Sequence, residues 1–163
     1  MEIKTTVKLD GLKELTKKYP EASKKARVSR ITEALLLLER AVKGKTPVGA
    51  GPIHLRDTIF QKVSYGVQAV VGNLGTPAIY GESVEYGTQP HFPPVAPIQH
   101  WVEKKLGITG KEAGSVAYLI ARAISRRGTK GQAMFGKGFA ENEQAVLRIL
   151  EMIPGDVVTG LSN

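Results

Sequence analysis

A long amphipathic segment that begins at Pro20 constrains the fold of this chain more than any other feature. Its apolar residues recur at helical spacing: Ile31, Leu35, Leu38 and Val42. Proline suits the first turn of a helix, because the amide hydrogen that it lacks would have no partner there. Gly44 and Pro47 follow the segment and are typical of helix ends. The pattern predicts a long helix from residue 20 to residue 42 that buries one face.

Two stretches alternate apolar and polar residues, which is the period of a half-buried strand. The first covers residues 3–9 and predicts an N-terminal strand. The second covers residues 55–71 and has Tyr65-Gly66 near its centre, so it predicts a β-hairpin. The alternation ends at residues 73–77. Residues 79–86 are compatible with a short helix, and the end of this stretch fits a strand equally well.

The second half of the chain predicts helices separated by loops. Residues 89–97 contain four prolines and should form an extended loop. A short helix is expected over residues 98–106, with Trp101 buried on its inner face. The next helix should bury the face that carries Val116, Leu119, Ile120, Ala123 and Ile124.

Glycine and proline also shape the predictions for the C-terminal region. Residues 128–138 contain four glycines and are expected to form a mobile loop. A final helix should begin near Phe139 and end before Pro154, with residues 155–163 as a loose tail. The chain is therefore expected to be a single α+β domain over residues 1–163, with a small antiparallel sheet packed against a long helix and further C-terminal helices.

Composition excludes several classes of protein. The hydrophobic fraction of 42% suits one globular core. No cysteine is present, which excludes disulfides and thiolate sites. No apolar run approaches the ~20 residues that span a bilayer, and the first residues lack the apolar core of a signal peptide, so a soluble protein without membrane contact is expected.

The net charge is +8, concentrated in residues 1–46 and 122–137. Such charge favours binding to polyanions such as DNA. It is equally well explained as a solvated surface that keeps the protein in solution.

Three groups of residues resemble reactive sites without completing one. Residues 131–138 nearly match a phosphate-binding P-loop, but Gly138 stands where Ser or Thr must hold magnesium. A metal set could in principle include His91, His100 and Glu103. Zinc sites usually need three or four ligands and an ordered second shell, but no further ligand is close in sequence and His91 lies in a proline-rich loop, so surface histidines are the simpler interpretation. Glu82 and Glu85 are most simply a solvated carboxylate pair. We therefore predict no catalytic residue, metal site or cofactor, and a protein that is not an enzyme.

Four sequence blocks, in order, are similar to those of one protein family. The first contains Thr46-Pro47-Val48, Gly51 and Leu55-Arg56-Asp57-Thr58-Ile59. The second contains Tyr80 and Val84-Glu85-Tyr86-Gly87-Thr88. The third contains Pro90-His91-Phe92-Pro93-Pro94, Ala96-Pro97 and Trp101. The fourth contains Ala117-Tyr118, Ala121-Arg122, Arg127-Gly128-Thr129-Lys130-Gly131 and Phe135. Together these blocks, within residues 46–150, resemble the neck or tail-completion proteins of long-tailed double-stranded DNA phages and prophages.

The resemblance implies a structural virion protein made in the bacterial host cytoplasm. Six or twelve copies would form a ring at the head–tail junction, and the ring would contact a head-closure or connector ring and tail-tube or tail-terminator proteins. The resemblance also allows non-specific contact between the ring and phage DNA. The alternative function, suggested by charge, is a free-standing non-specific DNA-binding protein.

Eight residues are the candidates for motif or subunit-interface roles: Glu85, Gly87, Thr88, Arg122, Arg126, Arg127, Lys130 and Phe135. Gly87 is expected to have positive φ, and Thr88 to bond nearby backbone. Glu85 either caps a loop or pairs with a basic residue of a neighbouring subunit. The basic residues face either DNA or acids such as Glu82 and Glu85 on the next subunit.

Overall fold

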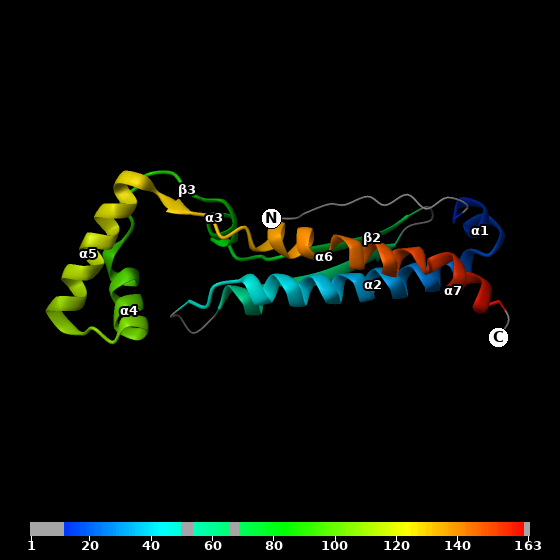
Figure 1. Cartoon of the computed structure of the whole chain (residues 1–163), viewed down its shortest axis with the longest axis horizontal. Coiled ribbons are helices and arrows are strands. Elements are labelled where there is room, and N and C mark those ends of the chain that lie inside the picture. The colour runs from blue at the N-terminus through cyan, green and yellow to red at the C-terminus, as the bar shows by residue number, and fades with distance from the viewer. Residues whose placement is uncertain (1–11, 50–53, 66–68, 162–163) are drawn as a thin grey trace.

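The computed structural model describes residues 12–49, 54–65 and 69–161, and it shows an elongated α+β protein with two parts (Figure 1). We call the larger part the body. It comprises α1 (Leu12–Lys18), α2 (Pro20–Lys45), a 3₁₀ turn (Leu55–Thr58), β1 (Phe60–Tyr65), β2 (Val70–Gly75), α3 (Gly81–Tyr86), α6 (Met134–Glu151) and α7 (Ile153–Thr159). The predicted fold class is confirmed: a small antiparallel sheet and C-terminal helices pack against one long helix.

We call the smaller part the arm. It consists of residues 89–94, α4 (Val95–Leu106) and α5 (Gly110–Arg127). Two short strands, β3 (Gly87–Thr88) and β4 (Thr129–Lys130), join the arm to the body. Figure 1 shows the arm at one end of the molecule, with its two helices folded on each other and held away from α2 and α6.

The predicted long helix is present as α2, which extends three residues further than the apolar pattern indicated. Pro20 lies in its first turn, and Glu39 and Lys43 form an ion pair with a distance of 2.6 Å between Oε1 and Nζ. The buried face of α2 includes Leu35, Leu38 and Val42. This face packs on α6, and the contact forms the main core of the body.

The prediction of a mobile loop over residues 128–138 is wrong, because α6 begins at Met134 rather than near Phe139. The reason is a close approach of two helices. Gly138 is buried against Val42 of α2, and a Cβ atom at Gly138 would lie 2.7 Å from Val42 Cγ2. Glycine normally disfavours a helix interior by about 1 kcal/mol, but here tertiary packing requires the absence of a side chain.

The predicted hairpin is present with shifted boundaries. Leu55–Thr58 forms the 3₁₀ turn, and β1 and β2 pair antiparallel with Gln61 opposite Leu74 and Val63 opposite Gly72. The second strand, β2, runs to Gly75, so it continues into residues 73–75, where the sequence predicted the end of the alternation. Gly72 faces α2, where Ile31 Cγ2 would lie 2.7 Å from an added Cβ, so a small residue occupies an inward position that the apolar pattern misses.

The loose tail predicted for residues 155–163 is also wrong over the residues that the structure describes. Residues 153–159 form α7, in which Pro154 lies in the first turn and Val157 is fully buried. Ile153 and Val157 pack with Ala26 of α2. Proline and glycine therefore lie at the start of this helix and do not mark the beginning of a loose tail.

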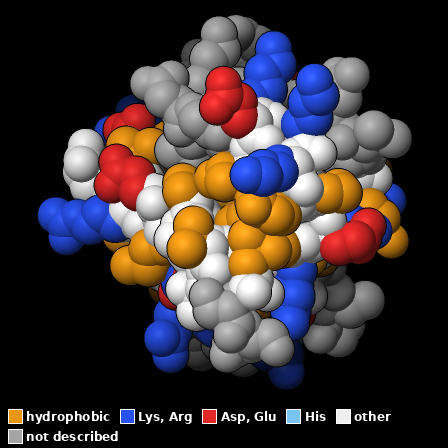
Figure 2. All heavy atoms as spheres, turned by 90° about the vertical axis from the view of Figure 1, so that its right-hand side faces the viewer, with side chains coloured by type: hydrophobic (Ala, Val, Ile, Leu, Met, Phe, Trp, Pro, Cys, Tyr) orange, Lys and Arg blue, Asp and Glu red, His pale blue; other side chains and the backbone are white. Residues whose placement is uncertain are grey.

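The end of the body that carries α1 and α7 exposes apolar surface. Figure 2 shows hydrophobic side chains gathered at the centre of this end, with both basic and acidic side chains around them. Exposed apolar residues in and beside α7 are Met152, Val158 and Leu161. The N-terminal strand expected over residues 3–9 lies outside the described residues. Within the described part, no helix combines the length and apolar character needed to cross a membrane.

Candidate interaction site: the arm and its junction with the body

The junction is the place where the chain leaves the body for the arm and returns. Antiparallel pairing places Gly87 opposite Lys130 and Thr88 opposite Thr129. The outgoing strand follows α3 directly, and the returning strand leads into α6 within four residues. Five of the predicted motif or interface residues lie in these strands or in the turns of α3 and α6 beside them, although they are up to 50 positions apart in sequence: Glu85, Gly87, Thr88, Lys130 and Phe135.

Glu85 caps the N-terminus of α6. Its side chain is buried, with 4% exposed, and its two oxygens accept hydrogen bonds from the backbone amides of Phe135 at 2.9 Å and Gly136 at 3.0 Å. These amides belong to the first turn, which has no acceptors of its own within the helix. A carboxylate there also complements the helix dipole. Of the two roles predicted for Glu85, the cap is the one that the geometry fits, and little of the carboxylate is left for a neighbouring subunit.

Two glycines allow the strands of the junction to touch. Gly87 has φ of 82°, as predicted, and a Cβ atom there would lie 2.1 Å from the carbonyl oxygen of Thr129. Gly128 has φ of 68°, and its Cβ would lie 1.9 Å from the carbonyl oxygen of Thr88. No other residue type fits either position without moving the backbone.

Threonine side chains form hydrogen bonds between the two strands of the junction. Thr88 Oγ1 accepts a hydrogen bond from the backbone amide of Thr129 at 3.1 Å, and the two hydroxyl groups lie 3.0 Å apart. The predicted backbone bond of Thr88 is thus present. Gly128 and Thr129 were not singled out individually, although both belong to the last of the sequence blocks that resemble the phage family.

The arm has a core of small side chains. Val102 of α4 is fully buried, as are Ala113, Ala117 and Ala121, which lie four residues apart along α5. Alanines at this spacing form one face of a helix, and their size lets α4 approach closely. The sequence prediction for α5 is wrong, because it placed Leu119 on the inner face, whereas this side chain is 61% exposed.

Aromatic and aliphatic side chains lie on the outside of the arm. Trp101 is 40% exposed, which contradicts its predicted burial, because Val102 and not Trp101 points towards α5. Phe92 and Tyr118 are both exposed, and their rings pack at a tilted angle with centroids 6.1 Å apart. Exposed apolar groups of this kind mark interaction surfaces.

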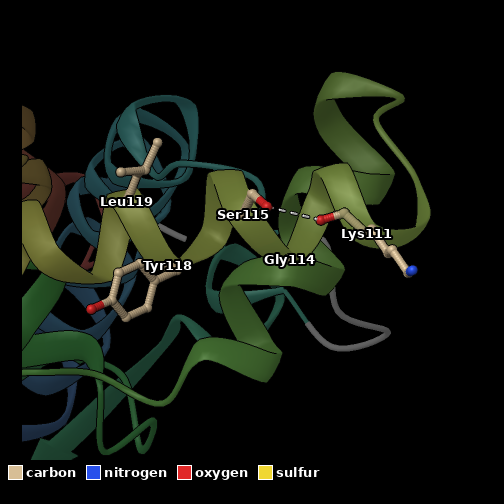
Figure 3. A pocket seen from close by; sticks show the side chains of 5 residues that line it. All are labelled: Lys111, Gly114, Ser115, Tyr118 and Leu119. Carbon is tan, nitrogen blue, oxygen red and sulfur yellow. Dashed lines mark hydrogen bonds between the residues drawn. The ribbon is translucent and has the colours of Figure 1, made fainter.

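A shallow hollow runs along the outer side of α5 (Figure 3). The residues that line it are Lys111, Gly114, Ser115, Tyr118 and Leu119. Within it, Ser115 Oγ donates to the carbonyl oxygen of Lys111 at 3.1 Å, and the Tyr118 and Leu119 side chains project in different directions. The hollow is open to solvent and mixes apolar and basic groups, so it suits a surface contact.

The predicted basic cluster is divided between arm, junction and body. Arg122, Arg126 and Arg127 are exposed on α5, and Lys130 is exposed on β4. None of the four forms an ion pair with an acid of the described residues. Lys137 belongs to α6, where its ammonium group donates to the carbonyl oxygen of Gln132 at 2.8 Å. The exposed cations of α5 and β4 are therefore not neutralised by ion pairs with described residues.

The near-reactive groups fall into structural roles. Residues 134–138 of the near-match to a P-loop form the first turn of α6, capped by Glu85. Glu82 is exposed while Glu85 is buried, so the two carboxylates do not form a solvated pair. In the described ranges, no three residues among His, Cys, Asp and Glu are grouped so that they could hold a metal ion.

Comparison with protein-family models, with curated proteins and with solved structures finds no match for this chain. The resemblance to the phage family therefore remains a prediction from the sequence blocks.

Proposed function

We propose that this protein is a structural subunit that assembles with copies of itself into a ring at the head–tail junction of a long-tailed phage. One structural observation carries the assembly part of the proposal. The arm stands off from the body, has a core made of one valine and three alanines, and exposes aromatic side chains at Phe92, Trp101 and Tyr118. Contact with another molecule would bury these exposed apolar groups, which is favourable for association.

The position in the virion rests on the sequence blocks. The second and fourth blocks form the junction, where Glu85, Gly87 and Gly128 each meet a requirement of the backbone. In the proposed assembly the ring has six or twelve copies, and connector and tail proteins cover its two faces.

The test of the proposed function is the mass of the full-length protein in solution, measured by light scattering over a range of concentrations. A mass of six or twelve copies, and rings visible by electron microscopy, are the expected results. Incorporation into particles together with connector and tail proteins tests the location. A protein that stays monomeric at every concentration, alone and with those partners, would refute the proposal.

A second candidate function is non-specific DNA binding, and the outer side of α5 favours it. Lys111, Arg122 and Arg126 are exposed there beside Tyr118, and basic side chains with an aromatic ring suit a phosphate backbone and its bases. Anisotropy of a labelled DNA duplex, titrated with the protein at several salt concentrations, measures this activity. Binding by a monomer, with a steep loss of affinity as salt rises, would favour this candidate over the ring.

A further inference from the structure

The exposed aromatic pair of the arm comes from two separate segments of the chain. Phe92 lies in the proline-rich loop and Tyr118 on α5, and their rings pack at 56° with centroids 6.1 Å apart. Both side chains are more than half exposed, so each ring also presents surface to solvent. The two residues are far apart in sequence, and only the fold brings their rings together.

Basic residues lie on the same side of α5 as Tyr118. Lys111 is seven residues before Tyr118 and lies about 20° from it around the helix axis, and Arg122, four residues after it, lies about 40° away. Both cations are exposed, and neither forms an ion pair with a described residue. We call Lys111, Ser115, Tyr118 and Arg122, together with Phe92, the aromatic–basic stripe.

The acids of the arm lie outside this stripe. Residues 89–127 contain six Lys and Arg residues and two acids. Glu112 is exposed, but it is six residues before Tyr118 and lies about 120° from it around α5, on the side of Leu119. Glu103 of α4 is half-buried and accepts a hydrogen bond from Gln99 at 3.1 Å. The charged residues of the stripe itself are therefore all cations.

The hollow on α5 leaves room for a flat group beside Tyr118 (Figure 3). Gly114 has no side chain, and Ser115 turns its hydroxyl group towards the carbonyl oxygen of Lys111. Small residues thus form the floor between the Tyr118 ring and the Lys111 side chain. A planar base can lie against the exposed part of this ring, with cations of the stripe to either side along the helix.

We infer that the stripe binds single-stranded nucleic acid, with unpaired bases on Phe92 and Tyr118 and phosphates at Lys111 and Arg122. This inference rests on the second candidate function, DNA binding, and names the form of nucleic acid that the arm takes; it does not depend on a ring. Every base has a π face, so stacking on exposed rings tolerates any sequence. Lys111 and Arg122 are about 17 Å apart along the helix axis, which corresponds to about five nucleotides of one strand.

The two kinds of side chain in the stripe distinguish a single strand from a duplex. Cations bind the phosphates of either form, because the phosphate backbone is exposed in both. Aromatic rings stack on bases only where the bases are unpaired, since a duplex keeps the base faces inside its own stack. Phe92 and Tyr118 should therefore add affinity for a single strand alone.

Binding of two labelled DNAs to the full-length protein tests the inference. One is a pyrimidine-only single strand of about 15 nucleotides and the other is its duplex, and anisotropy is measured at several salt concentrations. The single strand should bind more tightly than the duplex. Tyr118→Ala should weaken single-strand binding by about fivefold or more and leave duplex binding within about twofold, whereas Tyr118→Phe keeps the ring and should bind like the unchanged protein. Arg122→Gln should weaken binding of both DNAs and reduce the salt slope by about one.

Matched controls lie on the other side of the arm. Gln99 of α4 is on the side of the stripe, because its Oε1 atom would lie 3.8 Å from a Cβ atom at Gly114. Trp101 is two residues later, about 200° around α4 from Gln99, and Lys105 follows it by one turn. Both are exposed, and Trp101→Ala and Lys105→Gln should leave the affinity for each DNA within about twofold. Circular dichroism establishes folding, and Phe92→Ala replaces Tyr118→Ala if that variant unfolds.

The outcomes are distinct. Equal affinity for the two DNAs, with no loss in Tyr118→Ala, would mean that only phosphates are bound, so the inference is wrong and the second candidate function stands. An equal loss in Trp101→Ala would also contradict the stripe. If Tyr118→Ala lowers the mass of an assembled protein in light scattering and leaves DNA binding unchanged, the stripe contacts protein and the inference is wrong. Absence of binding to either DNA refutes the second candidate function too, while the mass of the unchanged protein separately decides the ring.

Discussion

The body and the arm bury their helices in different ways. The core of the body contains large side chains such as Leu35, Leu38 and Phe135, packed between α2, α6 and the hairpin. The arm has helices of 12 and 18 residues whose fully buried residues are one valine and three alanines. Below about 40 residues, a chain rarely buries enough apolar surface to be stable without help. The body can thus support a fold, whereas the arm depends on the junction and on whatever covers it.

The largest expected effect comes from the core of the body. Phe135→Ala should lower the free energy of unfolding by about 3–5 kcal/mol, because a fully buried ring is lost and a cavity remains. Chemical denaturation followed by circular dichroism measures this change. Phe92→Ala is the matched control in the arm, where the ring is exposed, and it should cost about 1 kcal/mol or less. Equal costs for the two changes would contradict the division into a strong body and a weak arm.

The cap at the junction should give the next largest effect. Glu85→Ala leaves the amides of Phe135 and Gly136 without their acceptors, and we expect a loss of about 3 kcal/mol. Glu85→Gln keeps one acceptor oxygen and should lose less. Glu82→Ala, three residues earlier and exposed, is the control and should change little. A Glu85→Ala protein as stable as Glu82→Ala would mean that the hydrogen bonds at the start of α6 are dispensable.

The sequence predicted those parts of the fold whose signals are local. The helix over residues 20–42 has both an apolar stripe and end signals, so α2 was found almost whole. Gly87 and Thr88 were predicted from a short motif, because positive φ and side-chain-to-backbone bonds are properties of single residues. The hairpin was found with less accurate ends, because Gly72 faces α2 without contributing to an apolar pattern.

The missed parts depend on contacts between distant residues. Gly136 and Gly138 indicated a loop, but the cap from Glu85 and the packing on Val42 stabilise a helix there. In α5 both the alanine face and the face with Leu119 have helical period, and only the position of α4 decides which is buried. The same ambiguity misplaced Trp101. Sequence spacing identifies a face but does not identify its partner.

The arm should unfold before the body, and Trp101 makes this measurable. It is the single tryptophan of the chain and lies on α4, so its fluorescence reports the arm while circular dichroism reports all helices. Ala117→Leu overpacks the contact between α4 and α5 and should destabilise the arm by about 1–3 kcal/mol. The fluorescence transition should then shift to lower denaturant, with little shift in the main transition seen by circular dichroism.

The control for this change is Leu119→Ala on the exposed side of the same helix, which should leave the fluorescence transition of the monomer almost unchanged. Separate transitions for the two probes would show that arm and body are distinct cooperative units. Coincident transitions in Ala117→Leu, shifted by the same amount, would instead mean that the junction couples the two parts into one unit.

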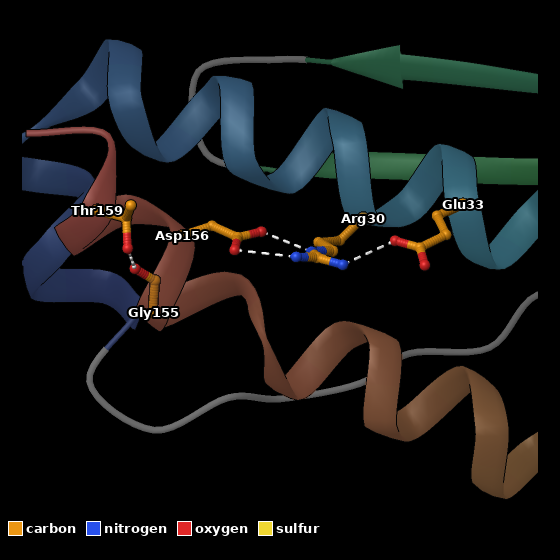
Figure 4. A network of polar contacts seen from close by, with 5 residues as sticks. All are labelled: Arg30, Glu33, Gly155, Asp156 and Thr159. Atoms are coloured by element: carbon orange, nitrogen blue, oxygen red, sulfur yellow. Dashed lines mark hydrogen bonds and ion pairs between the residues drawn. The ribbon is translucent and has the colours of Figure 1, made fainter. Parts of the chain in front are cut away.

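The smallest expected effect lies at the far end of the body, where α7 is tied to α2 (Figure 4). Arg30 donates to both oxygens of Asp156, at 2.5 Å from Nε and 3.0 Å from Nη2, and to Glu33 at 2.9 Å from Nη1. The hydrogen bonds from Arg30 lower the pKa of Asp156 below its ordinary value of 3.8. The hydrogen bonds that Arg30 donates to Asp156 and to Glu33 raise the pKa of Arg30 above its ordinary value.

Asp156→Asn should lower the melting temperature only slightly, because both partners of the pair are partly exposed and screened by solvent. A carboxyl group whose pKa is lower in the folded state stabilises the fold above its unfolded pKa, and this contribution disappears as pH falls through the folded pKa. The difference between the unchanged protein and the variant should therefore be constant above pH 3.8 and shrink below it. Melting curves from neutral to acidic pH measure it, with Glu82→Gln as an exposed control. A difference that persists undiminished at the acidic end would mean that α7 is held by the packing of Val157, with no contribution from the charge of Asp156.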